Sequence, residues 1–232
     1  MLSWMPACGS CFYCQREHTN MCETFRPGLE KGTALDGTTR LRLKGEALTQ
    51  FSTHSTFAEY AVVPEQACVP LDPEVSVVSA SLVGCAVMTG VGAAMYTAQI
   101  KPGDTVAVFG CGGIGLNVLQ GATLCGAETI VAIDTVAEKF ESARTFGATH
   151  TLDGKNDLEQ ALKDLSGGRG FDHILDATGN PMVQEKAIYP LRRGGTLTLV
   201  GVAPHDARVT FDTFRMHHQE TRVLGCFYGT GN

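Results

Sequence analysis

Three glycines near the middle of the chain constrain its fold more than any other feature of its 232 residues. Gly110, Gly112 and Gly115 stand in G-x-G-x-x-G register. A strand-like apolar run over 105–109 precedes them, and an amphipathic segment that predicts a helix to about residue 122 follows. In this setting the glycines allow a tight turn, close approach of a pyrophosphate to the backbone, and close helix–strand packing. The alternative is a glycine-rich turn that binds no ligand.

An acidic residue follows at the distance that a dinucleotide site requires. The second strand-like run, TIVAID, ends at Asp134, 19 residues after Gly115. A carboxylate here accepts hydrogen bonds from a ribose 2′-hydroxyl and repels a 2′-phosphate, which favours NAD over NADP. Asp134 could also cap the helix predicted for the residues after it. Lys139 either reaches the adenosine ribose or is solvated.

The rest of the chain alternates between strand and helix signals. The pattern predicts an α/β fold with a doubly wound, six-stranded parallel Rossmann sheet. A helix is expected over 157–165. The four later strands are expected at 150–153, 171–179, 196–202 and 221–228.

Four cysteines lie within fifteen residues near the start of the chain, at Cys8, Cys11, Cys14 and Cys22. Their C-x2-C-x2-C-x7-C spacing favours a tetrahedral zinc ion, and four thiolates leave no open position, so the zinc would be structural. An iron–sulfur cluster is the competing interpretation, although the last gap is longer than in ferredoxin-type runs. The other five cysteines are scattered, which suits a reducing, cytoplasmic compartment better than a disulfide framework.

Composition narrows the classes of partner. The formal net charge of −6 argues against nucleic acid and anionic membranes as partners. No signal peptide is expected at the N-terminus. The segment 75–100 contains no charged residue, but its small side chains favour a buried helix over a membrane span.

Taken in order, these motifs support a resemblance to a known family. The cysteine lobe, FAEYAVVPEQACVPLDPEV, VGCAVMTGVGAA and VAVFGCGGIGLNVLQGA follow one another along the chain. The chain resembles the zinc-containing alcohol dehydrogenases of the medium-chain dehydrogenase/reductase superfamily. The resemblance implies hydride transfer between an alcohol or aldehyde and NAD, with a small-molecule substrate and zinc as the metal.

The resemblance also implies roles for single residues. Cys85 matches a ligand of the catalytic zinc, although its surroundings alone favour a buried structural cysteine. Thr89 matches a position beside the nicotinamide. The remaining matches are the structural-zinc ligands Cys8, Cys11, Cys14 and Cys22, the pyrophosphate loop Gly110, Gly112, Gly113 and Gly115, the ribose contacts Asp134 and Lys139, and the nicotinamide side Thr178, Gly179, Val200 and Val202. For that last group, sheet core and turn is a strong alternative.

The sequence departs from the family in one respect that affects the expected function. The segment that holds the other two catalytic-zinc ligands and most of the GroES-like barrel has no counterpart here, so we expect a partial chain. Residues 1–86 would form a partial GroES-like domain with the zinc lobe, and 87–229 the Rossmann domain. We expect the dinucleotide site to be kept and the catalytic zinc site to be incomplete.

Two other functions are compatible with these residues. One is a non-catalytic module that binds zinc and a dinucleotide. The other is a metal-free quinone reductase of the same superfamily, which the cysteine lobe and Cys85 argue against. A homo-oligomer is expected, because the family often pairs its last Rossmann strand across a dimer and an unpaired sheet edge favours aggregation.

Overall fold

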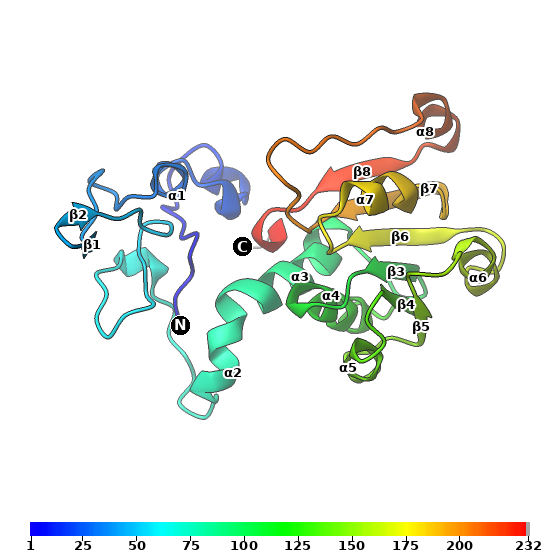
Figure 1. The fold of residues 1–232 in the computed structure, drawn as a ribbon, viewed down its shortest axis with the longest axis horizontal. Coiled ribbons are helices and arrows are strands. Elements are labelled where there is room, and N and C mark those ends of the chain that lie inside the picture. The colour runs from blue at the N-terminus through cyan, green and yellow to red at the C-terminus, as the bar shows by residue number, and fades with distance from the viewer. Residues whose placement is uncertain (231–232) are drawn as a thin grey trace. The chain divides into compact units, whose positions relative to one another are not determined.

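A computed structural model of the protein describes residues 1–230. Contacts divide the chain into two compact units, Met1–Cys85 and Ala86–Gly229 (Figure 1). The assignment of residues 1–86 to a partial GroES-like domain stays a prediction.

The second unit is built on one six-stranded sheet in which every neighbouring pair is parallel. The strand order is β5-β4-β3-β6-β7-β8, so the winding reverses between β3 and β6. This confirms the predicted doubly wound fold, in which ligands bind beyond the carboxyl ends of the strands at the reversal point. The strands are β3 (Thr105–Phe109), β4 (Thr129–Asp134), β5 (His150–Asp153), β6 (Phe171–Asp176), β7 (Leu191–Leu199) and β8 (Arg222–Gly225).

Helices cover both faces of this sheet (Figure 1). Side chains alternate along a strand, so Val106 and Val108 enter one core while Ala107 enters the other. The first core contains residues of η5, α4 and α5, and the second contains residues of α6 and α7. The elements of this unit are α3 (Met88–Gly92), the π-helical η5 (Ala93–Thr97), α4 (Gly113–Leu124), α5 (Lys139–Thr145), α6 (Glu159–Leu165), α7 (Pro181–Ala187) and α8 (Thr213–Gln219).

The later strand boundaries differ from those expected. β7 begins at Leu191 and ends at Leu199, and β6 ends at Asp176. The pairing is irregular, because Phe171 is opposite Leu191 while His173 is opposite Thr196. The extra residues form a bulge that includes Gly194 at φ +71°. Sequence patterns do not reveal such a bulge, and the predicted strand therefore started too late.

The first unit consists of short elements joined by long loops. Its sheet is a two-stranded antiparallel hairpin. The elements are the 3-10 turns η1 (Cys14–Arg16), η2 (Thr19–Met21) and η3 (Glu65–Ala67), the helices α1 (Arg26–Lys31) and α2 (Val77–Leu82), and the strands β1 (Arg42–Leu43) and β2 (Glu46–Ala47). A π-helical segment, η4 (Val83–Val87), continues from α2.

The uncharged segment forms a nearly continuous helical run. Val77–Thr97 is long and apolar enough to cross a membrane, with a mean hydropathy of 1.8, a property that core helices of soluble proteins share. Val77 and Val78 are each 76% exposed, whereas Ala93 and Ala94 are fully buried. The expected buried helix is thus found only in the second half of the run.

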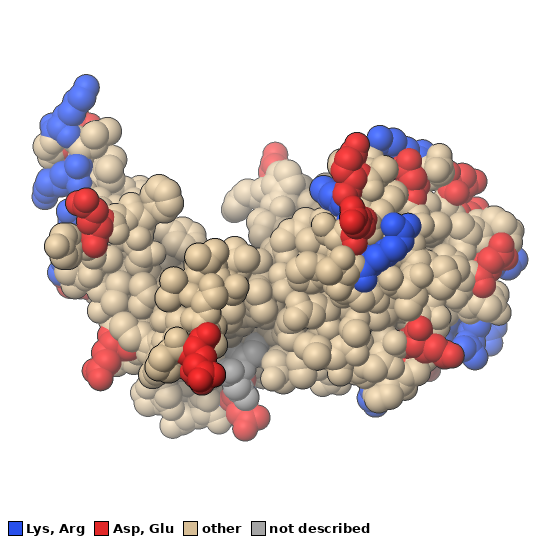
Figure 2. Space-filling model, turned by 90° about the horizontal axis from the view of Figure 1, so that it is seen from below, with Lys and Arg blue, Asp and Glu red and all other residues tan. Residues whose placement is uncertain are grey.

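Charged side chains of both signs are spread over the surface. On the face in Figure 2 they form small groups separated by uncharged surface.

Candidate functional site

The glycine-rich turn brings the N-terminus of α4 against the end of β3. Gly110 has φ +93°, a conformation that favours glycine. A Cβ at Gly115 would lie 1.7 Å from the carbonyl oxygen of Gly110, so the helix packs directly on the turn. A Cβ at Gly112 would meet no atom within 4 Å. The turn therefore leaves open space in front of the first amides of a twelve-residue helix, where an anion is favoured.

Asp134 lies at the end of β4, beside this turn, and is 8% exposed. Its carboxylate accepts hydrogen bonds from the backbone N–H of Cys111 at 2.7 Å and of Val136 at 2.9 Å. Burial opposes ionisation of Asp134, but these bonds and the nearby Lys139 outweigh it and hold its pKa below the usual value. The carboxylate is therefore ionised at neutral pH and tied to the glycine turn.

Two sequence-based alternatives for this region are wrong. Asp134 does not cap α5, which begins at Lys139 with Glu138 in the N-cap position. Lys139 is not simply solvated, because its ammonium lies 3.0 Å from Asp134 Oδ2. An incoming ribose hydroxyl would have to share the carboxylate with this lysine or displace it.

A cavity of about 1480 Å³ opens at this edge of the sheet. It brings together five of the predicted cofactor residues, namely Gly110, Gly112, Asp134, Lys139 and Thr178. Gly113, Gly115, Val200 and Val202 do not line it. Val200 is 5% exposed and Val202 is 92% exposed, and both follow the end of β7.

Asp176 is a residue of this edge that sequence reasoning missed. It is fully buried at the end of β6. Its carboxylate accepts hydrogen bonds from the backbone N–H of Thr178 at 2.9 Å and from Gln184 Nε2 at 2.8 Å. Asp176 thus fixes the loop that carries Thr178 into the cavity. An acid at a strand end followed two residues later by threonine was the available signal.

In the first unit, the structure gathers the four N-terminal cysteines into one cluster. Their sulfur atoms all lie within 4.8 Å of one another, and the Cys8–Cys14 and Cys11–Cys22 pairs are each 4.0 Å apart. A tetrahedral zinc with Zn–S bonds of about 2.3 Å needs sulfurs about 3.8 Å apart. The donor set and its spacing therefore fit a closed zinc site.

Hydrogen bonds and burial affect these thiols in opposite directions. The Thr24 side chain, with Ser10 and Cys11 adding further hydrogen bonds, lowers the pKa of Cys8 to about 5. Burial raises the pKa of Cys14 to about 12. The Cys11 N–H also points at Cys8 Sγ, at 3.4 Å. The backbone is thus arranged to donate to sulfur.

Cys85 and Thr89 lie outside both groups. Cys85 is exposed in η4, so the interpretation of it as a buried structural cysteine is wrong. Within residues 1–230, no group of three or more metal-ligating side chains includes Cys85. Thr89 is 7% exposed in α3 and does not line the cavity.

Comparisons with known proteins agree with this geometry. Residues 113–232 match the family described as zinc-binding dehydrogenase. The chain is 38% identical over 220 residues to alcohol dehydrogenase class-3 of Dictyostelium discoideum, covering 92% of this chain. It is 40% identical over 213 residues to an S-(hydroxymethyl)glutathione dehydrogenase of Escherichia coli, covering 90% of this chain. It spans 58% of the length of both relatives.

Solved structures give the same result. An alcohol dehydrogenase zinc-binding domain protein from Burkholderia ambifaria superposes with a TM-score of 0.92 at 31% identity. The match covers all of this chain and 63% of that one. Benzyl alcohol dehydrogenase from Acinetobacter calcoaceticus superposes with a TM-score of 0.86 at 28% identity, over all of this chain and 62% of that one. The chain belongs to the zinc-binding dehydrogenase family.

Proposed function

We propose that this chain supplies the NAD-binding part and the structural zinc site of a zinc-dependent alcohol dehydrogenase. The proposal rests on the glycine turn and Asp134, which are hydrogen-bonded to each other at the carboxyl edge of the sheet. The open space at Gly112 faces the N-terminus of α4, and the ionised Asp134 is hydrogen-bonded to the same turn. One accommodates a pyrophosphate and the other a ribose diol.

The proposed reaction is the oxidation of an alcohol to an aldehyde or ketone, or its reversal. The carbinol carbon loses a hydride to the nicotinamide of NAD, and the hydroxyl loses a proton. The names of the relatives support a substrate of this class, which would include an S-(hydroxymethyl) thiol adduct of formaldehyde. The cofactor performs the redox chemistry, and the protein binds it, orients it and excludes water.

The predicted cofactor residues other than Gly110 and Gly115, which shape the turn, have proposed tasks in binding the cofactor. The amides at Gly112 and Gly113 would donate to the pyrophosphate, and Asp134 would accept from the ribose, with Lys139 adjusting to admit it. Thr178, Val200, Val202 and Thr89 are proposed for the nicotinamide side. Of these four, Thr178 has direct support, because it lines the cavity.

Zinc is proposed at two places, one structural and one catalytic. Cys8, Cys11, Cys14 and Cys22 would hold a structural ion, which their spacing fits. Cys85 is proposed as one ligand of a catalytic ion that, when bound, polarises the substrate oxygen. One thiolate does not make a catalytic site, so we propose that residues 1–232 alone do not turn over alcohol.

The second candidate is a non-catalytic module that binds zinc and a dinucleotide. The isolation of Cys85 from other ligating side chains within residues 1–230 favours it for the chain as it stands. Metal analysis and alcohol-dependent NAD reduction separate the two. One zinc per chain without turnover agrees with an incomplete catalytic site. Two zinc ions per chain, with turnover abolished in Cys85→Ser, would show that the chain holds the complete site.

The proposed cofactor preference is tested by fluorescence titration with NADH and NADPH. We expect saturable NADH binding and affinity for NADPH at least about tenfold lower, a difference of about 1.4 kcal/mol. Equal affinities, or preference for NADPH, would refute the assignment of Asp134.

We further propose a homo-oligomer and a cytoplasmic location. β8 is the last strand of the sheet, which supports pairing with a second copy. Sedimentation equilibrium is expected to give a dimer or a larger assembly, and a monomer at micromolar concentration would contradict it. None of the nine cysteines, all of which lie within residues 1–230, is in a disulfide, which supports a reducing compartment.

A further inference from the structure

The cavity at the dinucleotide edge continues along the sheet face covered by α6 and α7, and its charge changes on the way. Its three lining carboxylates are on Asp134, which ends β4, on Asp157, which follows β5, and on Glu159, the first residue of α6. Five cationic side chains line the rest of the cavity, and the first of them, Lys163, lies one helical turn after Glu159. These residues, which we call the basic groove, are Lys163, Arg169, Lys186, Arg193 and Arg215.

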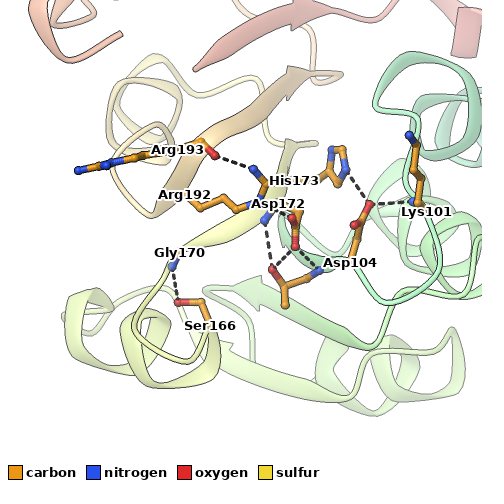
Figure 3. Close-up of polar contacts among 9 residues, drawn as sticks. Lys101, Asp104, Ser166, Gly170, Asp172, His173, Arg192 and Arg193 are labelled. Carbon is orange, nitrogen blue, oxygen red and sulfur yellow. Dashed lines mark hydrogen bonds and ion pairs between the residues drawn. The ribbon is translucent and has the colours of Figure 1, made fainter. Parts of the chain in front are cut away.

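The bulge in β7 separates two neighbouring arginines. Arg192 turns toward Asp172 and forms a short ion pair with it, whereas the Arg193 side chain extends away from that network (Figure 3). Within residues 1–230, the guanidinium of Arg193 has no hydrogen-bond or ion-pair partner, and neither has that of Arg169. Bulges commonly re-aim a side chain in this way. A second cavity, of about 680 Å³, also includes Arg169 and Arg193, so these two residues stand where the cavities meet.

Arg215 provides an independent sign of a missing acceptor. Its Nη2 donates to the Tyr189 carbonyl oxygen at 2.8 Å, and its guanidinium lies 5.2 Å from the centre of the Tyr189 ring. Its Nε is buried and has no hydrogen-bond partner among the described residues. Buried donors are rarely left unpaired, because each lost hydrogen bond is costly. Nε has almost no surface open to the groove, so an anion would become its acceptor only after the Arg215 side chain rotates.

The positive charge of the basic groove contrasts with the negative net charge of the whole chain. The formal net charge is −6, yet the cavity is lined by six cationic side chains, those of the basic groove and Lys139, against three carboxylates. Single exposed lysines and arginines need no explanation. Several like charges in one groove repel one another and raise the local concentration of anions. The clustering of these charges and the re-aimed Arg193 favour a bound anion over a merely solvated surface.

We propose that the basic groove binds a small anion that carries two or more phosphate groups, at a site separate from the dinucleotide edge. Guanidinium groups bind phosphate through two parallel N–H···O bonds, which suits Arg169 and Arg193. Tyr189 and Leu191 supply an apolar wall beside the cations for the uncharged part of an organic phosphate.

The test is isothermal titration of the full chain with inorganic tripolyphosphate at constant ionic strength, with and without saturating NADH. We expect one tripolyphosphate per chain to bind in the presence of NADH. Arg169→Gln and Arg193→Gln should each weaken this binding about tenfold, the loss expected for one charge-assisted contact. Arg208→Gln is the matched control, because Arg208 is exposed and lines neither cavity.

Two results would overturn the proposal. The first is loss of tripolyphosphate binding when NADH is present, which would place the anion at the glycine turn. The second is equal affinity in the Arg169→Gln/Arg193→Gln double variant and in Arg208→Gln. If the chain binds no NADH, the proposed cofactor assignment fails, but the comparison of arginine variants without NADH still decides this inference.

Discussion

At the scale of single residues, two glycines of the same turn have opposite surroundings. The space beside Gly112 is open, whereas a Cβ at Gly115 would collide with the backbone of Gly110. A shared motif therefore contains one position proposed for ligand contact and one that packing requires. Alanine at each position separates the two roles.

Gly115→Ala should lower the free energy of unfolding by about 3 kcal/mol, because α4 must move off the turn. Gly112→Ala should lower it by only about 1 kcal/mol or less, because its Cβ meets nothing and the loss is confined to the poorer N-cap that alanine makes. Gly112→Ala should instead weaken NADH binding about tenfold or more. Urea unfolding and NADH titration of both variants measure these effects. A stable Gly115→Ala, or a Gly112→Ala that binds NADH normally, would contradict the assignment.

A second prediction concerns His173, where burial decides the response to pH. Its Nε2 lies 3.0 Å from Asp104 Oδ2, and Asp172 and Arg192 are its other charged neighbours (Figure 3). Burial lowers the pKa of His173 despite the two carboxylates. The unfolded chain, with an ordinary pKa of about 6.5, therefore takes up the proton first as pH falls. Stability present at pH 7 is lost below about pH 6.5.

His173→Gln should reduce this loss between pH 7 and pH 5, measured as the change in urea midpoint. His205→Gln, at an exposed position, is the control and should behave like the parent chain. Burial also lowers the pKa of His54, so part of the slope should remain. An unchanged slope in His173→Gln would show that the residue does not couple folding to pH.

At the scale of elements, the sequence is most informative where a strong local pattern coincides with a buried strand. β3 and β4 have the expected bounds, because both have the buried, apolar character of central parallel strands. β5 also has the expected bounds, although it is a partly exposed strand at the edge of the sheet. The start of β7 was missed, because its bulge depends on pairing with β6. The Lys139–Asp134 ion pair was missed for a similar reason, since it depends on where α5 begins.

The cysteine segment is an element whose order should depend on metal. It contains only the short turns η1 and η2, so bound zinc would supply most of its stability. Cys14→Ser should abolish the binding of one zinc per chain. Removing zinc with a chelator should speed amide exchange over residues 8–22.

The controls lie outside the cysteine cluster. Amide exchange in β3 and β6 should stay slow, because those amides pair with neighbouring strands. Cys125→Ser, outside the cluster, should keep its zinc, and zinc retained by Cys14→Ser would refute the site.

At the scale of the whole molecule, the two units differ in how much of their structure could be predicted from the sequence. The 86–229 unit has a complete, two-faced sheet, and its topology followed from alternating strand and helix signals around one fingerprint. The 1–85 unit has short elements and exposed aromatic residues such as Phe57 and Tyr60. Only its cysteine cluster could be predicted, since ligand spacing is local whereas its loops depend on distant contacts.

The most direct test of the proposed NAD site is an NMR titration of the chain with NADH that resolves single backbone amides. We expect saturable shifts at Gly110, Gly112 and Gly113 and at the residues after Asp134, with NADPH producing them only at much higher concentration. Shifts confined to the basic groove, or none at the glycine turn, would contradict the proposal that this turn and Asp134 together bind NAD.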